Sequence, residues 1–386
     1  MQTPALSPER KLLAVLCVVA VLALLWATLW PFSPHPSNRV SWLPDSNGIR
    51  FGRTGVVFSN EPLEAPAEPP ASDACAIEVY LRPRSGDDSG NFLTFSSADN
   101  PESVFLRQWH ESLIVKRSIP RGGWGRRLVE FDADDTMRAG KLVLLTVSSG
   151  PNGIAVYADG KIAASAGDFR IRRDELYRQI FMGNSPSSFQ VWHGEVRGLA
   201  IFDEEISPAD AAAHYAEWSS GTRSAKASAD ASHLLARYEF RDRGGSVIHS
   251  DIASAPPILI PEHFLVPRKA MLDSVVNEFD WSGNYLKDVI QNTIGFMPLG
   301  FVLCGFFALS RSRGQAILIS TFLGGLLSFT IEFLQYYIPR RDSGWTDVIT
   351  NTTGTLFGAL IARPELVRGA LRLVHLIPPN RESETN

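Results

Sequence analysis

The chain contains a long uncharged apolar run close to its first residue. Residues 12–30, LLAVLCVVAVLALLWATLW, carry no charged side chain. About 20 such residues are needed for a helix to cross the hydrocarbon core of a bilayer. The run is longer than the apolar part of a typical cleaved signal peptide, and no small-residue cleavage site follows it. We therefore expect residues 1–34 to form an N-terminal tail and an uncleaved transmembrane helix.

Three further apolar, glycine-rich segments occupy residues 288–362, so the sequence predicts a bundle of four transmembrane helices. Lys and Arg in short loops mark the cytoplasmic side of such helices. These residues place both termini in the cytoplasm and residues 31–287 outside it. Arg340 and Arg341 are exceptions to the rule, because this topology puts them in a short loop on the outer side. Residues 363–386 are then expected to form a cytoplasmic amphipathic helix and tail. The supporting cations are Arg10, Lys11, Arg311, Arg313, Arg363, Arg368 and Arg372.

The middle of the chain alternates apolar and polar residues with a period of two, as half-buried strands do. The segment KLVLLTVSSGPNGIAVYADGKIAAS (141–165) predicts three strands joined by turns at Asn152-Gly153 and Asp159-Gly160. Ser207 is the expected N-cap of a helix over 207–218. We expect a β-sandwich over 46–220. Residues 221–287 are expected to be a linker with further strands and a membrane-proximal segment.

Composition narrows the function classes. The formal net charge is only −4, which gives no sign of nucleic-acid binding. The three cysteines, Cys17, Cys75 and Cys304, are scattered and do not suggest a disulfide framework. The sequence also lacks the HExxH, GxSxG, P-loop and CxxC patterns of familiar enzymes. The sequence thus favours a non-enzymatic function without excluding an enzymatic one.

One eight-residue pattern occurs twice, as DVIQNTIG (288–295) and DVITNTTG (347–354). With the topology above, both copies begin helices at the outer side of the bundle, where Asp can cap a helix and Gly allows close packing. Glu332 lies about 12 Å along its helix from this end, and an ionisable side chain at that depth is a functional candidate. The expected polar cluster comprises Asp288, Asn292, Glu332, Gln335, Arg341, Asp347 and Asn351.

Two interpretations of this cluster remain open. It is either a structural hydrogen-bond network or a site. As a site, its catalytic candidates are Glu332, Asp288, Asp347 and Arg341, and its binding candidates are Asn292, Gln335 and Asn351. Carboxylates of this kind serve as acids, bases or metal ligands, and Arg binds phosphate.

The segments DVIQNTIGFMPLGF, IEFLQYYIPRR and DVITNTTGTLFGALI, with LLWATLWPFSP (24–34), resemble the VanZ-like membrane domain over about residues 12–34 and 288–362. Ser343, Gly344 and Trp345 stand where some members have an acid between the Arg and the Asp. The resemblance implies a bacterial envelope protein, in a family named after a protein of teicoplanin resistance. It also implies that the β-sandwich is inserted after the first helix.

The middle segments IEVYLRP, LLTVSSGPNGIAVYADGKIAAS, FMGN and VWHGEVRGLAIFDEEISPADAAAHYAEW resemble laminin-G-like, concanavalin A-type jelly rolls. This resemblance implies a binding or scaffolding role. No cofactor is predicted, although calcium is an option because some members bind it through carboxylates. The acidic candidates are Asp132, Asp134 and Asp135. The tryptophans that could stack on sugar rings are Trp109, Trp124 and Trp192.

Three functions follow from the sequence. The favoured one is a multi-pass protein of the bacterial cytoplasmic membrane whose outer domain binds a glycan or peptidoglycan-related ligand, with a link to envelope stress or glycopeptide resistance. The second is an intramembrane enzyme or a handler of lipid-linked substrates that uses the polar cluster. The third is an adhesion or assembly module on an inert anchor. Membrane lipids are the expected surroundings, nucleic acid is not an expected partner, and the sequence defines no oligomeric state.

Overall fold

The computed structural model describes residues 8–66, 72–120, 126–221, 233–279 and 283–373. The chain divides into two compact units, a helical unit of residues 1–34 and 270–386 and a β-unit of residues 35–269. The chain therefore leaves the helical unit after its first helix and returns to it after the whole β-unit.

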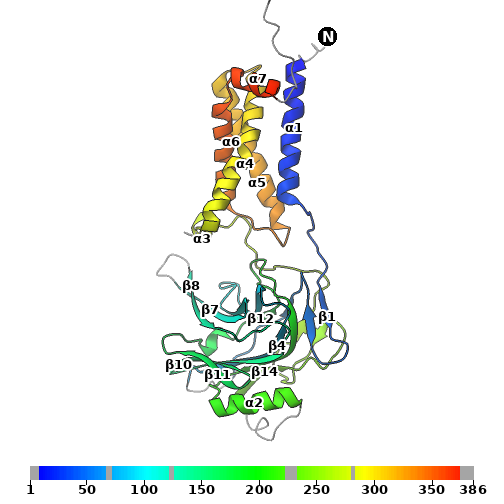
Figure 1. Cartoon of the computed structure of the whole chain (residues 1–386), viewed down its shortest axis with the longest axis vertical. Coiled ribbons are helices and arrows are strands. Elements are labelled where there is room, and N and C mark those ends of the chain that lie inside the picture. The colour runs from blue at the N-terminus through cyan, green and yellow to red at the C-terminus, as the bar shows by residue number, and fades with distance from the viewer. Residues whose placement is uncertain (1–7, 67–71, 121–125, 222–232, 280–282, 374–386) are drawn as a thin grey trace, which may run out of the picture. The chain divides into compact units, whose positions relative to one another are not determined.

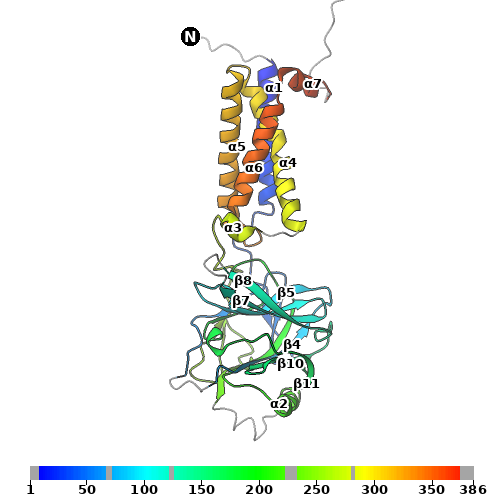
Figure 2. The ribbon, with the colours of Figure 1, turned by 90° about the vertical axis from the view of Figure 1, so that its left-hand side faces the viewer.

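The helical unit is built on four long helices that lie side by side (Figures 1 and 2). They are α1 (Pro8–Leu29), α4 (Gly283–Phe307), α5 (Arg313–Tyr336) and α6 (Trp345–Ile361). Two shorter helices, α3 (Val275–Glu278) and α7 (Pro364–Leu373), complete the described part of this unit. Small residues allow the closest contact, between α4 and α6: a Cβ atom added at Gly358 would lie 1.9 Å from the carbonyl oxygen of Met297.

Three described helices are long and apolar enough to cross a membrane: α1, α4 over Tyr285–Phe307, and α5. The fourth expected span, α6, has only 17 residues. It is shorter than the roughly 20 residues that a straight spanning helix needs. The structure therefore supports membrane association of a helical unit with three membrane-capable helices, and a fourth spanning helix stays a prediction.

The β-unit is a sandwich of two antiparallel sheets (Figure 1). The first has the order β1-β2-β13-β4-β9-β10-β11, with β14 also paired to β13, and the second has the order β15-β16-β3-β12-β5-β6-β7-β8. The strands of the first sheet are β1 (Val40–Trp42), β2 (Ile49–Phe51), β4 (Cys75–Pro83), β9 (Val143–Gly150), β10 (Gly153–Ala158), β11 (Lys161–Ala166), β13 (Gly194–Phe202) and β14 (Leu234–Tyr238). Those of the second are β3 (Val57–Ser59), β5 (Ser89–Ser96), β6 (Val104–Trp109), β7 (Ser112–Pro120), β8 (Arg126–Ala133), β12 (Gln179–Met182), β15 (Val247–Ile248) and β16 (Ile258–Leu259).

Local sequence explains several connections of the β-unit. Asp159 and Gly160 both have positive φ, 52° and 73°, and form the tight turn between β10 and β11. The helix α2 (Pro208–Ser220) begins at its N-cap Ser207, whose side chain accepts a hydrogen bond from the Asp210 amide. It ends at Gly221, which has a φ of 69°.

The β-unit is wider than the 46–220 expected from the sequence. Strand β1 precedes that range, and β14, β15 and β16 follow it. These strands have two to five residues each and join the sheets through pairing with β2, β13 and β3. Strands β14, β15 and β16 lie in the segment 221–287, where the sequence predicts further strands, whereas β1 was not predicted. The first part of the linker expected within 221–287, residues 222–232, lies outside the described residues.

Candidate functional site

The polar cluster of the helical unit resolves into separate contacts at helix ends. The side-chain amide of Gln335 donates to the carbonyl oxygen of Thr28 at 3.1 Å. The guanidinium of Arg341 donates to the carbonyl oxygen of Trp30 at 3.0 Å. Both carbonyls lie at the C-terminal end of α1, where backbone oxygens have no partner within the helix. Arg341, one of the two exceptions to the charge rule, thus caps α1.

Two carboxylates bind the N-terminus of α6. The N-cap Gly344 has no side chain to cap this helix. Instead, its amide donates to Oε2 of Glu332 at 3.0 Å, and the Thr346 amide donates to Oε2 of Glu278 at 3.0 Å. A negative charge at this position also complements the helix dipole. Glu332, with 1% of its surface exposed, is therefore held by the start of α6.

The asparagines of the repeated pattern join α6 to its neighbours. Asn292 on α4 donates to Oδ1 of Asp347 at 2.7 Å, and Asn351 donates to Oγ of Ser328 on α5 at 2.9 Å. Asp288 is exposed and separate from these contacts. In the part of the chain that the structure describes, no group of three or more His, Cys, Asp or Glu is placed to hold a metal ion. These hydrogen bonds join helices and helix ends, and a catalytic role stays a prediction.

The tryptophans proposed to stack on sugar rings differ in their exposure to solvent. Trp192 is fully buried, packs against Phe51 and Phe92, and donates to Gln108 at 2.6 Å, so it has no face to offer a sugar. Trp109 is 50% exposed, with the Arg107 guanidinium 5.6 Å from the centre of its ring, and its role in sugar stacking stays a prediction. Trp124 falls outside the described residues.

The three aspartates proposed for calcium, Asp132, Asp134 and Asp135, are exposed around the end of β8. Burial, followed by the charges of Glu130 and Asp134, raises the pKa of Asp132 above its usual value. Asp134 accepts a hydrogen bond from Ser112. Within the described residues these aspartates form no group suited to a metal ion.

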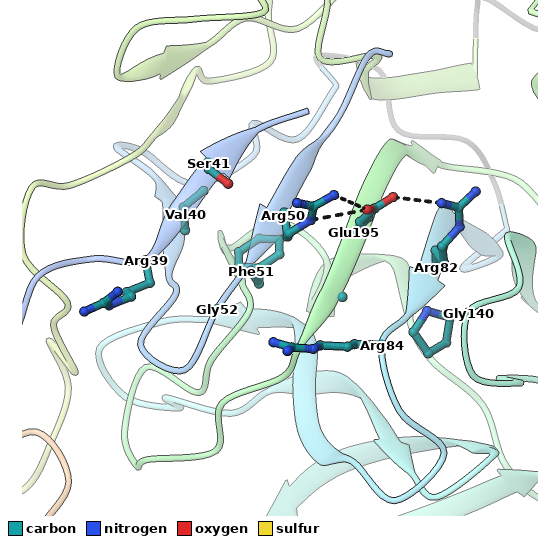
Figure 3. A pocket seen from close by; sticks show the side chains of 12 residues that line it. Arg39, Val40, Ser41, Arg50, Phe51, Gly52, Arg82, Arg84, Gly140 and Glu195 are labelled. Atoms are coloured by element: carbon teal, nitrogen blue, oxygen red, sulfur yellow. Dashed lines mark hydrogen bonds and ion pairs between the residues drawn. The ribbon is translucent and has the colours of Figure 1, made fainter. Parts of the chain in front are cut away.

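A site that the sequence did not single out lies on the outer face of the first sheet (Figure 3). Pairing places Ser41, Arg50, Glu195 and Arg82 opposite one another on β1, β2, β13 and β4. Arg50 is exposed between buried Ile49 and Phe51, so this row points away from the core. Glu195 accepts from Arg50 at 2.8 Å and from Arg82 at 3.4 Å.

A second row lies two residues further along the same strands. Gly52 donates its amide to the carbonyl of Arg39, and Arg84 donates its amide to the carbonyl of His193. Gly52 has no side chain, and the His193 ring is held by Asp88 at 2.9 Å. The two ends of this row are therefore the arginines Arg39 and Arg84, which are both exposed.

Between the two rows lies a pocket of about 660 Å³. We call it the arginine pocket. Its lining residues are Arg39, Val40, Ser41, Arg50, Phe51, Gly52, Arg82, Pro83, Arg84, Gly140, Gly194 and Glu195. Burial would raise the pKa of Glu195, but hydrogen bonds from Arg50 and Arg197 and the charge of Arg82 outweigh it and lower that pKa. Glu195 is therefore an anion that fixes the arginines around it.

One sequence signal could have pointed to this site. The segment YLRPR places Arg82 and Arg84 two residues apart, hence on one face of a strand. The sequence could not show that β1, β2 and β13 would lie beside that strand and bring Arg39, Arg50 and Glu195 to it.

The structure therefore combines a helical, membrane-type unit with an inserted β-sandwich that has an open charged pocket. Residues 238–368 match the VanZ/LLP1 family, so the C-terminal part of the chain is VanZ-like, as its sequence motifs predicted. The matched range contains α3, α4, α5 and α6 and begins within the last strands of the β-unit. None of the curated proteins matches the chain.

Among solved structures, the chain is similar to a heptameric SAP-like pentraxin from Limulus polyphemus, with 11% identity, a TM-score of 0.32, and coverage of 45% of this chain and 79% of the pentraxin. It is also similar to the binding domain of botulinum neurotoxin DC, solved in complex with SialylT, with 13% identity and a TM-score of 0.35. That alignment covers 47% of this chain and 45% of the toxin chain, so it spans less than half of the latter. The family assignment thus depends on residues 238–368, and the β-sandwich is defined by its own two sheets.

Proposed function

We propose that this chain is a membrane-anchored glycan-binding protein of the bacterial cell envelope. In this proposal the helical unit anchors the chain in the cytoplasmic membrane, and the β-unit binds carbohydrate outside the cytoplasm. The charge distribution of the short loops supports a topology with both termini in the cytoplasm. The chain is not proposed to be an enzyme; Glu332, its buried catalytic candidate, accepts a hydrogen bond from the start of α6, which supports a structural role.

The observation that carries the proposal is the arginine pocket. Its volume of about 660 Å³ lies within the range of ligand sites, roughly 300–1,000 Å³. Guanidinium groups donate, the Glu195 carboxylate accepts, and the Ser41 hydroxyl does both, so together they match a ligand that is rich in hydroxyl groups. Because Arg50, Glu195 and Arg82 are held by ion pairs, little side-chain freedom is lost when a ligand binds.

The proposal is tested by filling the pocket. The purified full-length chain in detergent is screened against envelope oligosaccharides, and any ligand found is titrated against Ser41→Trp. Ser41 is exposed on an edge strand, so an indole fits there without disturbing the core, and we expect it to weaken binding at least about tenfold. Ile162→Trp, on the exposed edge strand β11, places the same side chain away from the pocket and should leave binding unchanged.

A full-length chain that binds no oligosaccharide would contradict the proposal. Equal affinity of wild type and Ser41→Trp would also contradict it, because the glycan would then bind elsewhere.

A further inference from the structure

We infer that the ligand of the arginine pocket is an anionic glycan, a carbohydrate that carries carboxylate or phosphate groups, and that Arg39 and Arg84 bind those groups. This inference rests on the proposed function and specifies its ligand class. It follows from how the charges of the pocket are distributed.

The pocket is positively charged on a chain that is negative overall. Four arginines and one glutamate line it, a formal charge of +3, whereas the whole chain has −4. Such a local excess of one sign attracts ligands of the opposite sign.

The charges of the pocket are not satisfied equally. Glu195 binds Arg50, Arg82 and Arg197, so its single negative charge is shared by three cations. Among the described residues, no ion pair or hydrogen bond involves the side chain of Arg39 or of Arg84. Two cations on the pocket wall are thus available to an anion.

Other arginines of the same sheet or its neighbours have acids of their own. Arg237 binds both Glu217 and Glu239 at 2.7 Å, and Arg241 also binds Glu239. Arg39 and Arg84 have no acidic partner among the described residues, and both line the pocket (Figure 3).

The spacing of the two arginines indicates an extended ligand. Arg39 extends β1 and Arg84 extends β4, with β2 and β13 between them. Three strand spacings of ~4.8 Å separate their backbones by about 14 Å. A single small anion cannot reach both side chains from one position unless they bend towards each other. An oligomer with an acidic group on more than one sugar can contact both, while its hydroxyls face Ser41 and Glu195 in the first row.

The experiment compares two ligands with the same sugar backbone, of which only one carries charged carboxylates. The full-length chain in detergent is titrated with an oligogalacturonate and with its fully methyl-esterified form, which has the same sugars and linkages but no carboxylate charge. We expect the ester to bind at least about tenfold more weakly, because charge-assisted hydrogen bonds from arginine are lost. The affinity for the oligogalacturonate should also fall as salt is raised. A poly(glycerol phosphate) oligomer, run in parallel, shows whether phosphate or carboxylate is the preferred anion.

Three variants test whether Arg39 and Arg84 bind the charged groups of the ligand. Arg39→Gln and Arg84→Gln should each weaken oligogalacturonate binding about tenfold and leave ester binding nearly unchanged. Both residues are exposed and have no acidic partner among the described residues, so the variants should fold normally. Arg127→Gln removes an exposed arginine of β8 in the other sheet and should have no effect.

The outcomes separate the two proposals. If oligogalacturonate and ester bind equally, and Ser41→Trp still removes both, the pocket binds a neutral glycan and the anionic inference is overturned. If no carbohydrate binds, the proposed function fails and the inference fails with it. If Arg127→Gln weakens binding as much as Arg39→Gln does, the anion binds through diffuse charge and the assignment to the pocket is incorrect.

Discussion

Glu332 is the carboxylate for which the sequence left a structural and a functional role open, and the structure shows it buried with a defined partner. Its Oε2 accepts from the Gly344 amide, and Ser343 donates to its backbone carbonyl at 2.9 Å. A buried amide without an acceptor costs roughly 1–3 kcal/mol. The residue therefore contributes to the position of α6, and this role can be separated from a role in chemistry.

We predict that Glu332→Ala lowers the free energy of unfolding of the detergent-solubilised protein by roughly 1–3 kcal/mol, because the Gly344 amide loses its acceptor. Thermal unfolding measures the change. Glu332→Gln retains an acceptor oxygen and should recover most of that stability. Asp288→Asn, at an exposed position, is the control. Both variants are then tested for their ability to restore the envelope phenotype of a deletion strain. A Glu332→Gln protein that is stable but does not restore the phenotype would indicate that Glu332 belongs to a functional site and is not only a helix cap.

At the scale of elements, the two copies of the repeated pattern have different packing roles. A Cβ atom added at Gly354 on α6 would lie 2.0 Å from the carbonyl oxygen of Thr293 on α4. The matching position on α4, Gly295, has no described atom within 4 Å of such a Cβ. The last glycine of the repeated pattern is therefore at a helix–helix contact in one copy, Gly354, and away from any described neighbour in the other, Gly295.

We predict that Gly354→Ala destabilises the helical unit by roughly 1–3 kcal/mol, since the α4 and α6 backbones must separate. Gly295→Ala should be neutral or stabilise by up to about 1 kcal/mol through helix propensity. Thermal unfolding of both variants in the same detergent measures the difference. Equal destabilisation by the two substitutions would mean that α4 and α6 do not pack as described.

The elements also show which features a sequence can reveal. Asp159-Gly160 and Ser207 act through local backbone geometry, so their turn and helix cap were predictable. The burial of Trp192 was not, because an indole suits a core and a sugar platform equally well until its neighbours are known. The arginine pocket was hidden for a related reason. Arg39, Arg50 and Glu195 come from chain segments that only the sheet order brings together.

For the whole molecule, the division of the chain matters most. The helical unit combines residues before and after the β-unit, and Gln335 and Arg341 bind carbonyl groups at the end of α1. The first helix is thereby joined to the VanZ-like part, although the family match begins only at residue 238. The sequence motifs identified this part well because they are contiguous. In the proposed function, the helical unit anchors the chain and the β-unit recognises the ligand.

The most direct test of this account is to locate a bound glycan on the full-length protein. An oligogalacturonate carrying a photoreactive diazirine is cross-linked to the detergent-solubilised chain, and the modified peptides are identified by mass spectrometry. The account predicts cross-links within residues 39–52 and 82–84, at the arginine pocket, which excess unlabelled oligogalacturonate suppresses. Specific cross-links confined to the segment around the exposed Trp109, or to the helical unit, would contradict it.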